Sequence, residues 1–376
     1  MKILMLADRM ESGGAETHVE TLAQEFIRRG HTVAVLSGGG RNADRMERAG
    51  ILQLRFLWTE RDLLRLLRAR RAFRAAMKKH SFDLLHGHTR GWAFLLGVFC
   101  GRKKLPPAVF TVHAAFFRRP WLRFFCFWGD RTIAVGEDLR AWAADRLGVP
   151  AQRIEVIPNG VDCHRFHATE EARRGDRILF VSRLDADCSL GAELLCEIAP
   201  GLRRKFPQLQ IRIAGGGDQL ARLQKSAAEA NRLCDDAEAV VLLGYLDDPS
   251  AEFFRADIFV GVSRAAMEGA AGGCAVVLCG NEGRGGILTP DAPLLGVGNF
   301  CCRGEALPHA AWLECVLRDL LEDSELRQRV AKRGREWILR DYGAEGMAAR
   351  TEAVYFAVTG IQKRQNDTKN EEGGGA

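Results

Sequence analysis

The chain has 376 residues, of which 47% are hydrophobic and 27% are charged. This length suffices for about two domains of ordinary size. The composition is that of a globular protein, and it excludes a collagen-like chain, a continuous coiled coil or a mainly disordered protein.

The net charge of +6 is unevenly distributed. Residues 1–167 contain 28 Lys and Arg against 16 Asp and Glu, whereas residues 168–376 contain 26 against 32. A basic N-terminal half therefore precedes a mildly acidic C-terminal half. This asymmetry indicates an anionic partner for the first half.

Neither a secretory signal nor a transmembrane helix is predicted. The apolar run after Lys2 is interrupted by Asp8 and Arg9, which makes it too short for the hydrophobic region of a signal peptide. The longest strongly apolar run, 92–100, has nine residues against the roughly 20 that span a bilayer. The 11 cysteines show no paired CxxC spacing, so free thiols in a reducing cytoplasm are expected.

The first part of the chain is predicted to form a parallel sheet covered by helices, because strand-like and helical segments alternate. Apolar runs typical of buried strands lie at 2–7, 32–36, 84–86, 109–112, 132–135 and 154–157. Helices are expected between them, near 19–29, 61–79, 90–100, 118–128 and 137–147.

The same alternation restarts after 156–162, where Pro158 and the pair Asn159-Gly160 are typical of a linker. Strands are then expected at 177–182, 210–214, 239–243, 258–262 and 275–279, and helices beyond about 309. Two such units bind ligands at the carboxyl ends of their strands, so the cleft between them is the expected site.

The loop after the first strand contains Gly13 and Gly14. Two glycines between a strand and a helix let backbone N–H groups approach an anion at the helix N-terminus. Glu16 follows in the first helical turn, where the helix dipole favours a carboxylate. A plain tight turn is the alternative interpretation, and the lack of a GxGxxG pattern argues against a dinucleotide site.

Histidines follow two of the predicted strands. His113 comes directly after 109–112 and is a candidate to hydrogen-bond a sugar or a leaving group, with a structural or surface role as the alternative. For His86 and His88 the structural role is favoured. No helical spacing or cysteine partner supports a zinc site from these three residues, so no metal is predicted.

Polar residues also follow the strands of the second half. Arg183 is suited to grip a diphosphate bidentately, and Gly215 and Gly216 permit close approach of a phosphate or ribose. Glu268 lies at a helix start after the strand 258–262. Its carboxylate can accept both hydroxyls of a ribose or simply complement the helix dipole.

In their order and spacing, these segments resemble the retaining glycosyltransferases of family 4, which have the GT-B fold. The resemblance extends over residues 1 to about 358. Its motifs are Gly13-Gly14-Ala15-Glu16, Thr111-Val112-His113, Ala134-Val135-Gly136-Glu137, Ile157-Pro158-Asn159-Gly160-Val161-Asp162, Arg183-Leu184 and Met267-Glu268-Gly269-Ala270-Ala271-Gly272-Gly273.

The resemblance implies an α/β protein with two Rossmann-like α/β/α domains that face each other across a cleft. Residues 1–167 would form the acceptor-side domain and 168–340 the domain that binds the nucleotide sugar. Residues 341–362 would form a helix that crosses back to the first domain. The polar tail 363–376 is expected to be disordered.

The implied reaction moves a sugar from a UDP- or GDP-sugar to a lipid-linked or cell-envelope glycan acceptor, with retained anomeric configuration. No cofactor or metal is implied, because arginine and helix N-termini stabilise the leaving diphosphate. The matching positions make Gly14, Glu16 and His113 catalytic candidates. The donor-binding candidates are Gly13, Arg183, Gly215, Gly216, Gly244, Tyr245, Glu268 and Glu282.

Two positions depart from the family pattern. Cys188 stands where the family usually has a lysine, and Val260 stands where it usually has a second glutamate. Glu282 is a candidate to compensate for the missing carboxylate. The departures leave two alternatives open: a nucleotide-sugar-binding partner without transfer activity, and a sugar-nucleotide epimerase or hydrolase on the same fold.

Basic residues mixed with apolar ones suggest contact with an anionic membrane. One such segment is the helix expected at 61–79, and the other is 116–128, where arginines alternate with aromatic residues. A solvated helix face and core aromatics are the alternatives. We therefore expect a cytoplasmic protein, peripheral at the inner membrane face, and no nucleic-acid partner.

Overall fold

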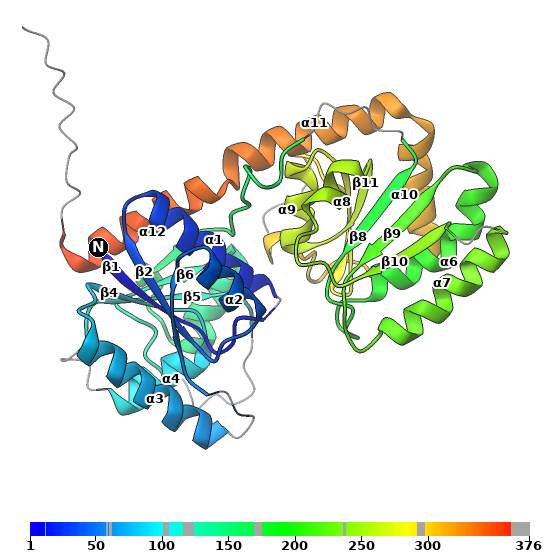
Figure 1. The fold of residues 1–376 in the computed structure, drawn as a ribbon. Coiled ribbons are helices and arrows are strands. Elements are labelled where there is room, and N and C mark those ends of the chain that lie inside the picture. Colours follow the sequence, from blue (N-terminus) through cyan, green and yellow to red (C-terminus); the bar gives the residue numbers. More distant parts are fainter. Residues whose placement is uncertain are drawn as a thin grey trace, which may run out of the picture.

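The computed structural model describes residues 1–11, 13–57, 59, 62–100, 105–115, 124–168, 175–235, 238–291 and 298–361. Figure 1 shows two α/β units next to each other, with the last helices of the chain running from the second unit back along the first. Within these ranges, no helix combines the length and the apolar composition that crossing a membrane requires.

The first unit contains a seven-stranded parallel sheet with the order β3-β2-β1-β4-β5-β6-β7. The strand order reverses between β1 and β4, and such a reversal creates a ligand crevice beyond the carboxyl ends of the strands. The strands are β1 Lys2–Leu6, β2 Thr32–Ser37, β3 Leu52–Arg55, β4 Leu84–Gly87, β5 Ala108–Val112, β6 Arg131–Ala134 and β7 Ile154–Val156. The α-helices are α1 Gly14–Arg28, α2 Arg41–Arg48, α3 Asp62–Lys79, α4 Arg90–Phe99 and α5 Glu137–Trp142.

The second unit contains a six-stranded sheet with the order β10-β9-β8-β11-β12-β13, parallel except for the last pair. Its strands are β8 Arg177–Val181, β9 Gln210–Ala214, β10 Val240–Gly244, β11 Ile258–Gly261, β12 Ala275–Gly280 and β13 Gly283–Ile287. Its helices are α6 Leu190–Lys205, α7 Leu220–Cys234, α8 Ser250–Arg255, α9 Ser263–Ala271, α10 Ala310–Glu322 and α11 Ser324–Asp341.

Both faces of the central strands of each sheet are buried, as continuous apolar strands predict. In β1, Ile3 and Met5 pack in one apolar cluster with residues of α1 and α12 (Ala344–Thr359). Leu4 and Leu6 point to the other face and pack with residues of α3 and α4. All four side chains are fully buried, so the central strand anchors both layers of the first unit.

The C-terminal helix crosses back to the first unit, as the family resemblance implied. α11 packs against the second unit, and α12 then runs along the first unit beside α1 (Figure 1). The crossing point is held by hydrogen bonds from the Val161 amide to the Tyr342 carbonyl and from the Ala344 amide to the Val161 carbonyl. Tyr355 of α12 is fully buried and hydrogen-bonds His86.

The prediction of a helix at 118–128 is wrong for 124–128, the part that the structure describes. Residues 124–130 form a short turn and a loop, and the remainder of the predicted helix lies outside the described residues. The Phe127 amide instead donates to the Ala93 carbonyl, and a Cβ on Gly97 of α4 would come within 2.1 Å of the Phe125 carbonyl oxygen. Phe127 and Trp128 are buried by this close approach, which favours a loop over a helix.

Several elements were not predicted: β3, β13, α2, α7 and α8. The helix expected to start at Glu268 is α9, but it begins at Ser263, so Glu268 lies in its second half and does not complement the positive end of the helix dipole. The tail predicted at 363–376 lies outside the described residues. All eleven cysteines are free thiols, as expected.

Candidate functional site

A cleft of about 790 Å³ lies between the two units, at the carboxyl ends of strands from both sheets. This is where two facing parallel sheets are expected to bind a ligand. Eight of the predicted site residues line it: Gly13, Gly14, Arg183, Gly215, Gly216, Tyr245, Glu268 and Glu282. Glu16, His113 and Gly244 are not among its lining residues.

The turn after β9 brings the backbone close to the cleft. Gly215 has φ +150°, and a Cβ there would lie 2.0 Å from the Ser182 carbonyl oxygen, so only glycine fits. Its amide donates to the carbonyl of Gly244 at 2.8 Å. This bond ties the ends of β9 and β10 together and places Tyr245, the residue after Gly244, on the cleft wall.

Arg183 enters the cleft from the loop after β8. Its guanidinium donates to Asp185 at 2.8 Å and to Asp187 and the Cys188 sulfur at 3.3 Å each. The side chain is nevertheless 47% exposed, so it can exchange these carboxylates for a diphosphate. Burial raises the pKa of the Cys188 thiol to about 11, so this residue does not replace the usual lysine charge.

Glu268 lies on α9 and is almost enclosed, with 13% of its side chain exposed. Burial raises the pKa of its carboxyl group, which the charge of Arg264 partly opposes. The two side chains form an ion pair of 3.8 Å at i, i+4 spacing. This spacing is the signal that identifies Arg264 as a site residue, although sequence reasoning missed it.

Arg264 connects the second unit to the first. Its guanidinium donates to the Gly160 carbonyl at 3.0 Å and to the Thr21 hydroxyl of α1 at 3.5 Å. Its Nε is buried without a hydrogen-bond partner among the described residues. Because Arg264 also lines the cleft, it presents a cation at the junction of the two units.

Val260 is fully buried in the apolar core around β11. It therefore offers a bound sugar neither a carboxylate nor an exposed surface. Glu282 does line the cleft, but Arg303 binds it at 2.9 Å. The same arginine donates to Asp138 of the first unit at 3.2 Å, so the two ion pairs of Arg303 connect the second unit to the first.

Two further contacts hold the units face to face. Arg45 of α2 donates to the Asp247 carbonyl at 3.1 Å, and it also binds the Glu20 carboxylate. Arg41 stacks 4.4 Å above the ring of Tyr245. Tyr245, a predicted donor-binding residue, thus lies where both units contribute to the cleft wall.

The N-terminus of α1 faces the cleft from the first unit. Gly14 begins the helix and Gly13 caps it, and a Cβ on Gly13 would lie 2.3 Å from a carboxylate oxygen of Glu16. The Glu16 side chain therefore folds back over the helix end. Burial raises the pKa of its carboxyl group above the usual value, and the nearby charge of Arg183 opposes only part of this rise.

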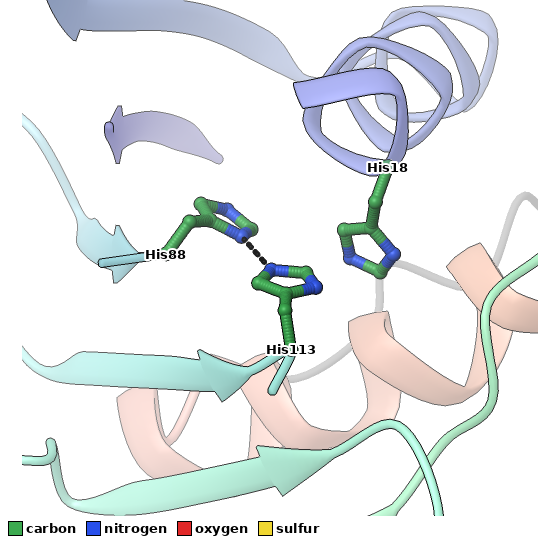
Figure 2. A group of neighbouring side chains, drawn as sticks. All are labelled: His18, His88 and His113. Carbon is green, nitrogen blue, oxygen red and sulfur yellow. Dashed lines mark hydrogen bonds between the residues drawn. The ribbon is translucent and has the colours of Figure 1, made fainter. Parts of the chain in front are cut away.

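His113 lies behind the cleft wall, in a group of histidines (Figure 2). Its Nε2 and the Nδ1 of His88 are 3.2 Å apart, and its ring lies 4.7 Å from that of His18. Burial is the main cause that lowers the pKa of His113 to about 3 and that of His88 well below its usual value. Both rings are neutral at neutral pH.

The comparisons with known families cover most of the chain. Residues 12–165 match the family described as Glycosyltransferase Family 4, and residues 175–294 match that described as Glycosyl transferases group 1. The chain belongs to glycosyltransferase family 4. This family member is 26% identical, over 93% of its length and 94% of the relative's, to the phosphatidyl-myo-inositol mannosyltransferase of Mycobacterium tuberculosis.

Solved structures show the same fold. A glycosyltransferase from Rickettsia africae ESF-5 superposes with a TM-score of 0.73 at 16% identity, covering 95% of this chain and 98% of that one. Anabaena HepE in complex with UDP gives a TM-score of 0.69 at 15% identity, covering 95% and 100%. The expected GT-B architecture is confirmed.

Replacing Arg183 with alanine is expected to weaken nucleotide diphosphate binding by more than tenfold. Hydrogen bonds between charged groups contribute about 1.5–3 kcal/mol each. Calorimetric titration with UDP and GDP measures this affinity. Arg232→Ala is the matched control, because Arg232 is also an exposed, paired arginine of the second unit but lies outside the cleft lining. Equal affinities of the two variants would remove Arg183 from the site.

Proposed function

We propose that this glycosyltransferase moves a hexose, with mannose as the first candidate, from a UDP- or GDP-sugar to a phosphatidylinositol-type lipid. The observation that carries the proposal is similarity over nearly the full length of both chains to a phosphatidyl-myo-inositol mannosyltransferase. The cleft supports it, since cationic and glycine-rich donor candidates lie opposite the N-terminus of α1.

In this proposal, Arg183 binds the diphosphate and stabilises the charge that develops on the leaving group. Glu268 accepts hydrogen bonds from the ribose, and the backbone at Gly215 and Gly216 approaches the donor closely. The N-terminus of α1, with Gly13 and Gly14, faces the transferred sugar. The transfer proceeds with retention and without a metal ion, because arginine and helix dipoles supply the positive charge.

Exposed apolar and basic side chains on the first unit support contact with a lipid surface. On α3, Leu63 is 67% exposed and Leu67 40%, while Arg71, Arg74 and Lys78 are exposed on the same helix. Phe124 is 73% exposed. Apolar side chains among cations bind an anionic lipid surface, so we propose peripheral contact with the membrane through this unit.

The test is release of nucleoside diphosphate by the purified chain with GDP-mannose or UDP-sugars and vesicles that contain phosphatidylinositol. We expect turnover that depends on both substrates and is unchanged by EDTA. Vesicles of phosphatidylcholine alone are the control for the acceptor. Loss of activity in EDTA, restored by a divalent ion, would contradict the metal-free reaction.

The same assay separates the transferase from its alternatives. A protein that binds the donor without turnover would be a nucleotide-sugar-binding partner. A protein that consumes the donor equally without vesicles would be a hydrolase or an epimerase. Either result would overturn the proposed transfer.

A further inference from the structure

Arg264 is a buried cation at the cleft that none of the proposed donor contacts uses. It is the second residue of α9 and is only 7% exposed. Removing a charged group from water is costly unless the group is paired and fully hydrogen-bonded. The Nε of Arg264 has no hydrogen-bond partner in the described part of the chain, so the protein itself compensates this cation incompletely.

Arg264 differs from the other cations that line the cleft. Each of the other four binds a carboxylate oxygen at 2.9 Å or less. Arg264 is 3.8 Å from the Glu268 carboxylate, which is longer than a hydrogen bond. Its charge is therefore the least neutralised of the five, and it lies where little water screens it. Within the described ranges, the arginines that line the cleft are Arg45, Arg165, Arg183, Arg264 and Arg303.

The side chain of Arg264 approaches the N-terminus of α1. A Cβ on Gly14, the first residue of α1, would lie 3.8 Å from the Cδ of Arg264. The positive end of the helix dipole and the guanidinium therefore act on the same part of the cleft. The Glu16 carboxylate folds over this helix end, which shows that a negative group is accommodated there.

The donor side of the cleft is otherwise poor in positive charge. Arg183 binds both Asp185 and Asp187, and one cation with two carboxylates carries no net positive charge. Cys188 stands at the usual lysine position, and burial raises the pKa of its thiol to about 11, so it is uncharged. A diphosphate carries more than one negative charge, and a further cation is needed to balance it.

We propose that Arg264 provides the second positive charge for the diphosphate of the donor, in place of the charge that is absent at Cys188. This inference rests on the proposed donor class, a nucleotide-diphosphate sugar. The helix α9 would then serve two parts of the donor, since Glu268 is the candidate for the ribose and Arg264 acts on the diphosphate.

Two contacts hold the guanidinium of Arg264 in this place. It donates to the Gly160 carbonyl of the linker at 3.0 Å and to the Thr21 hydroxyl of α1 at 3.5 Å. A cation that is held in position before the ligand binds needs little reorganisation, which strengthens its interaction with developing negative charge. Because both partners lie outside the second unit, the position of this charge also depends on how the two units are arranged.

The experiment is calorimetric titration of the full chain with UDP, GDP, UMP and GMP. We expect the wild-type chain to bind one diphosphate more tightly than the monophosphate of the same base. Arg264→Gln is expected to weaken binding of that diphosphate by about tenfold or more, the usual effect of losing one interaction with a charged group. Binding of the monophosphate is expected to weaken clearly less. A merely structural role would weaken both ligands equally, so the ratio of the two affinities isolates the charge.

A lysine at position 188 provides the second arm of the test. Cys188→Lys in the Arg264→Gln background is expected to restore most of the lost diphosphate affinity. The control is Arg212→Gln, because Arg212 is a partly buried, ion-paired arginine of β9 outside the cleft lining, and it is expected to leave both affinities unchanged. Circular dichroism shows whether each variant is folded.

The possible results separate this inference from the proposed function. A folded Arg264→Gln variant that binds the diphosphate as tightly as the wild type overturns the inference and leaves the donor class intact. An equal loss of affinity for both ligands also overturns it. Without restoration by Cys188→Lys, the proposed equivalence of the two positions is wrong. A wild-type chain that binds none of the nucleotides would overturn the donor class and, with it, this inference.

Discussion

Replacing Glu268 with glutamine is expected to lower kcat/KM for the donor sugar by about 10- to 100-fold. Glutamine has nearly the same size but removes the charge that would bind both ribose hydroxyls. A hydrogen bond to a charged group contributes about 1.5–3 kcal/mol, which corresponds to this range. Initial rates at varied donor concentration, with a fixed amount of lipid acceptor, measure the effect.

The control for Glu268 is Glu314→Gln on α10. Glu314 also pairs with an arginine at i, i+4, but it lies outside the cleft lining, so unchanged kinetics are expected. Thermal unfolding of both variants is compared, since Glu268→Gln leaves the buried Arg264 without its ion partner. A well-folded Glu268→Gln variant with wild-type kinetics would exclude ribose binding by this residue.

The pH dependence of donor binding provides an independent check. Burial raises the pKa of Glu268, so its carboxylate becomes protonated at a higher pH than an exposed glutamate. A protonated carboxyl group accepts fewer hydrogen bonds. Donor affinity is therefore expected to fall as the pH decreases through this raised pKa, and the effect should disappear in Glu268→Gln.

The sequence predicted the central strands because a parallel strand buried on both faces is a continuous apolar run. The edge strands lack this signal. β3 is Leu-Gln-Leu-Arg and partly exposed, and β13, Gly283–Ile287, contains three glycines. Both belong to the sheets through pairing with a neighbour, and local composition does not show that pairing.

The candidate site was predictable to the extent that its residues follow strands. Arg183, Gly215 and Gly216 come within two residues of strand ends, and the structure places all three on the cleft wall. The placement of His18 depends on Asn159, which is 141 residues away in the chain. Packing of the linker against α1 creates that contact, so no local pattern could indicate it.

The fold itself is most sensitive where α12 crosses to the first unit. Replacing Tyr355 with alanine is expected to lower the free energy of unfolding by about 3–5 kcal/mol, the usual cost of removing a buried aromatic ring. Tyr355 is fully buried, packs 5.0 Å from the ring of Phe26 and hydrogen-bonds His86. Urea denaturation followed by tryptophan fluorescence measures the change.

Two companion variants separate the ring from its hydroxyl group. Tyr355→Phe keeps the packing but removes the hydrogen bond to His86, so a loss of about 1–3 kcal/mol is expected. Phe356→Ala is the control, because Phe356 is only half-buried and a clearly smaller loss than that of Tyr355→Ala is expected. Equal losses for the two alanine variants would show that α12 is not anchored through Tyr355. Because the His86 ring lies 4.0 Å from that of His88, this anchor also supports the histidines at the sheet edge.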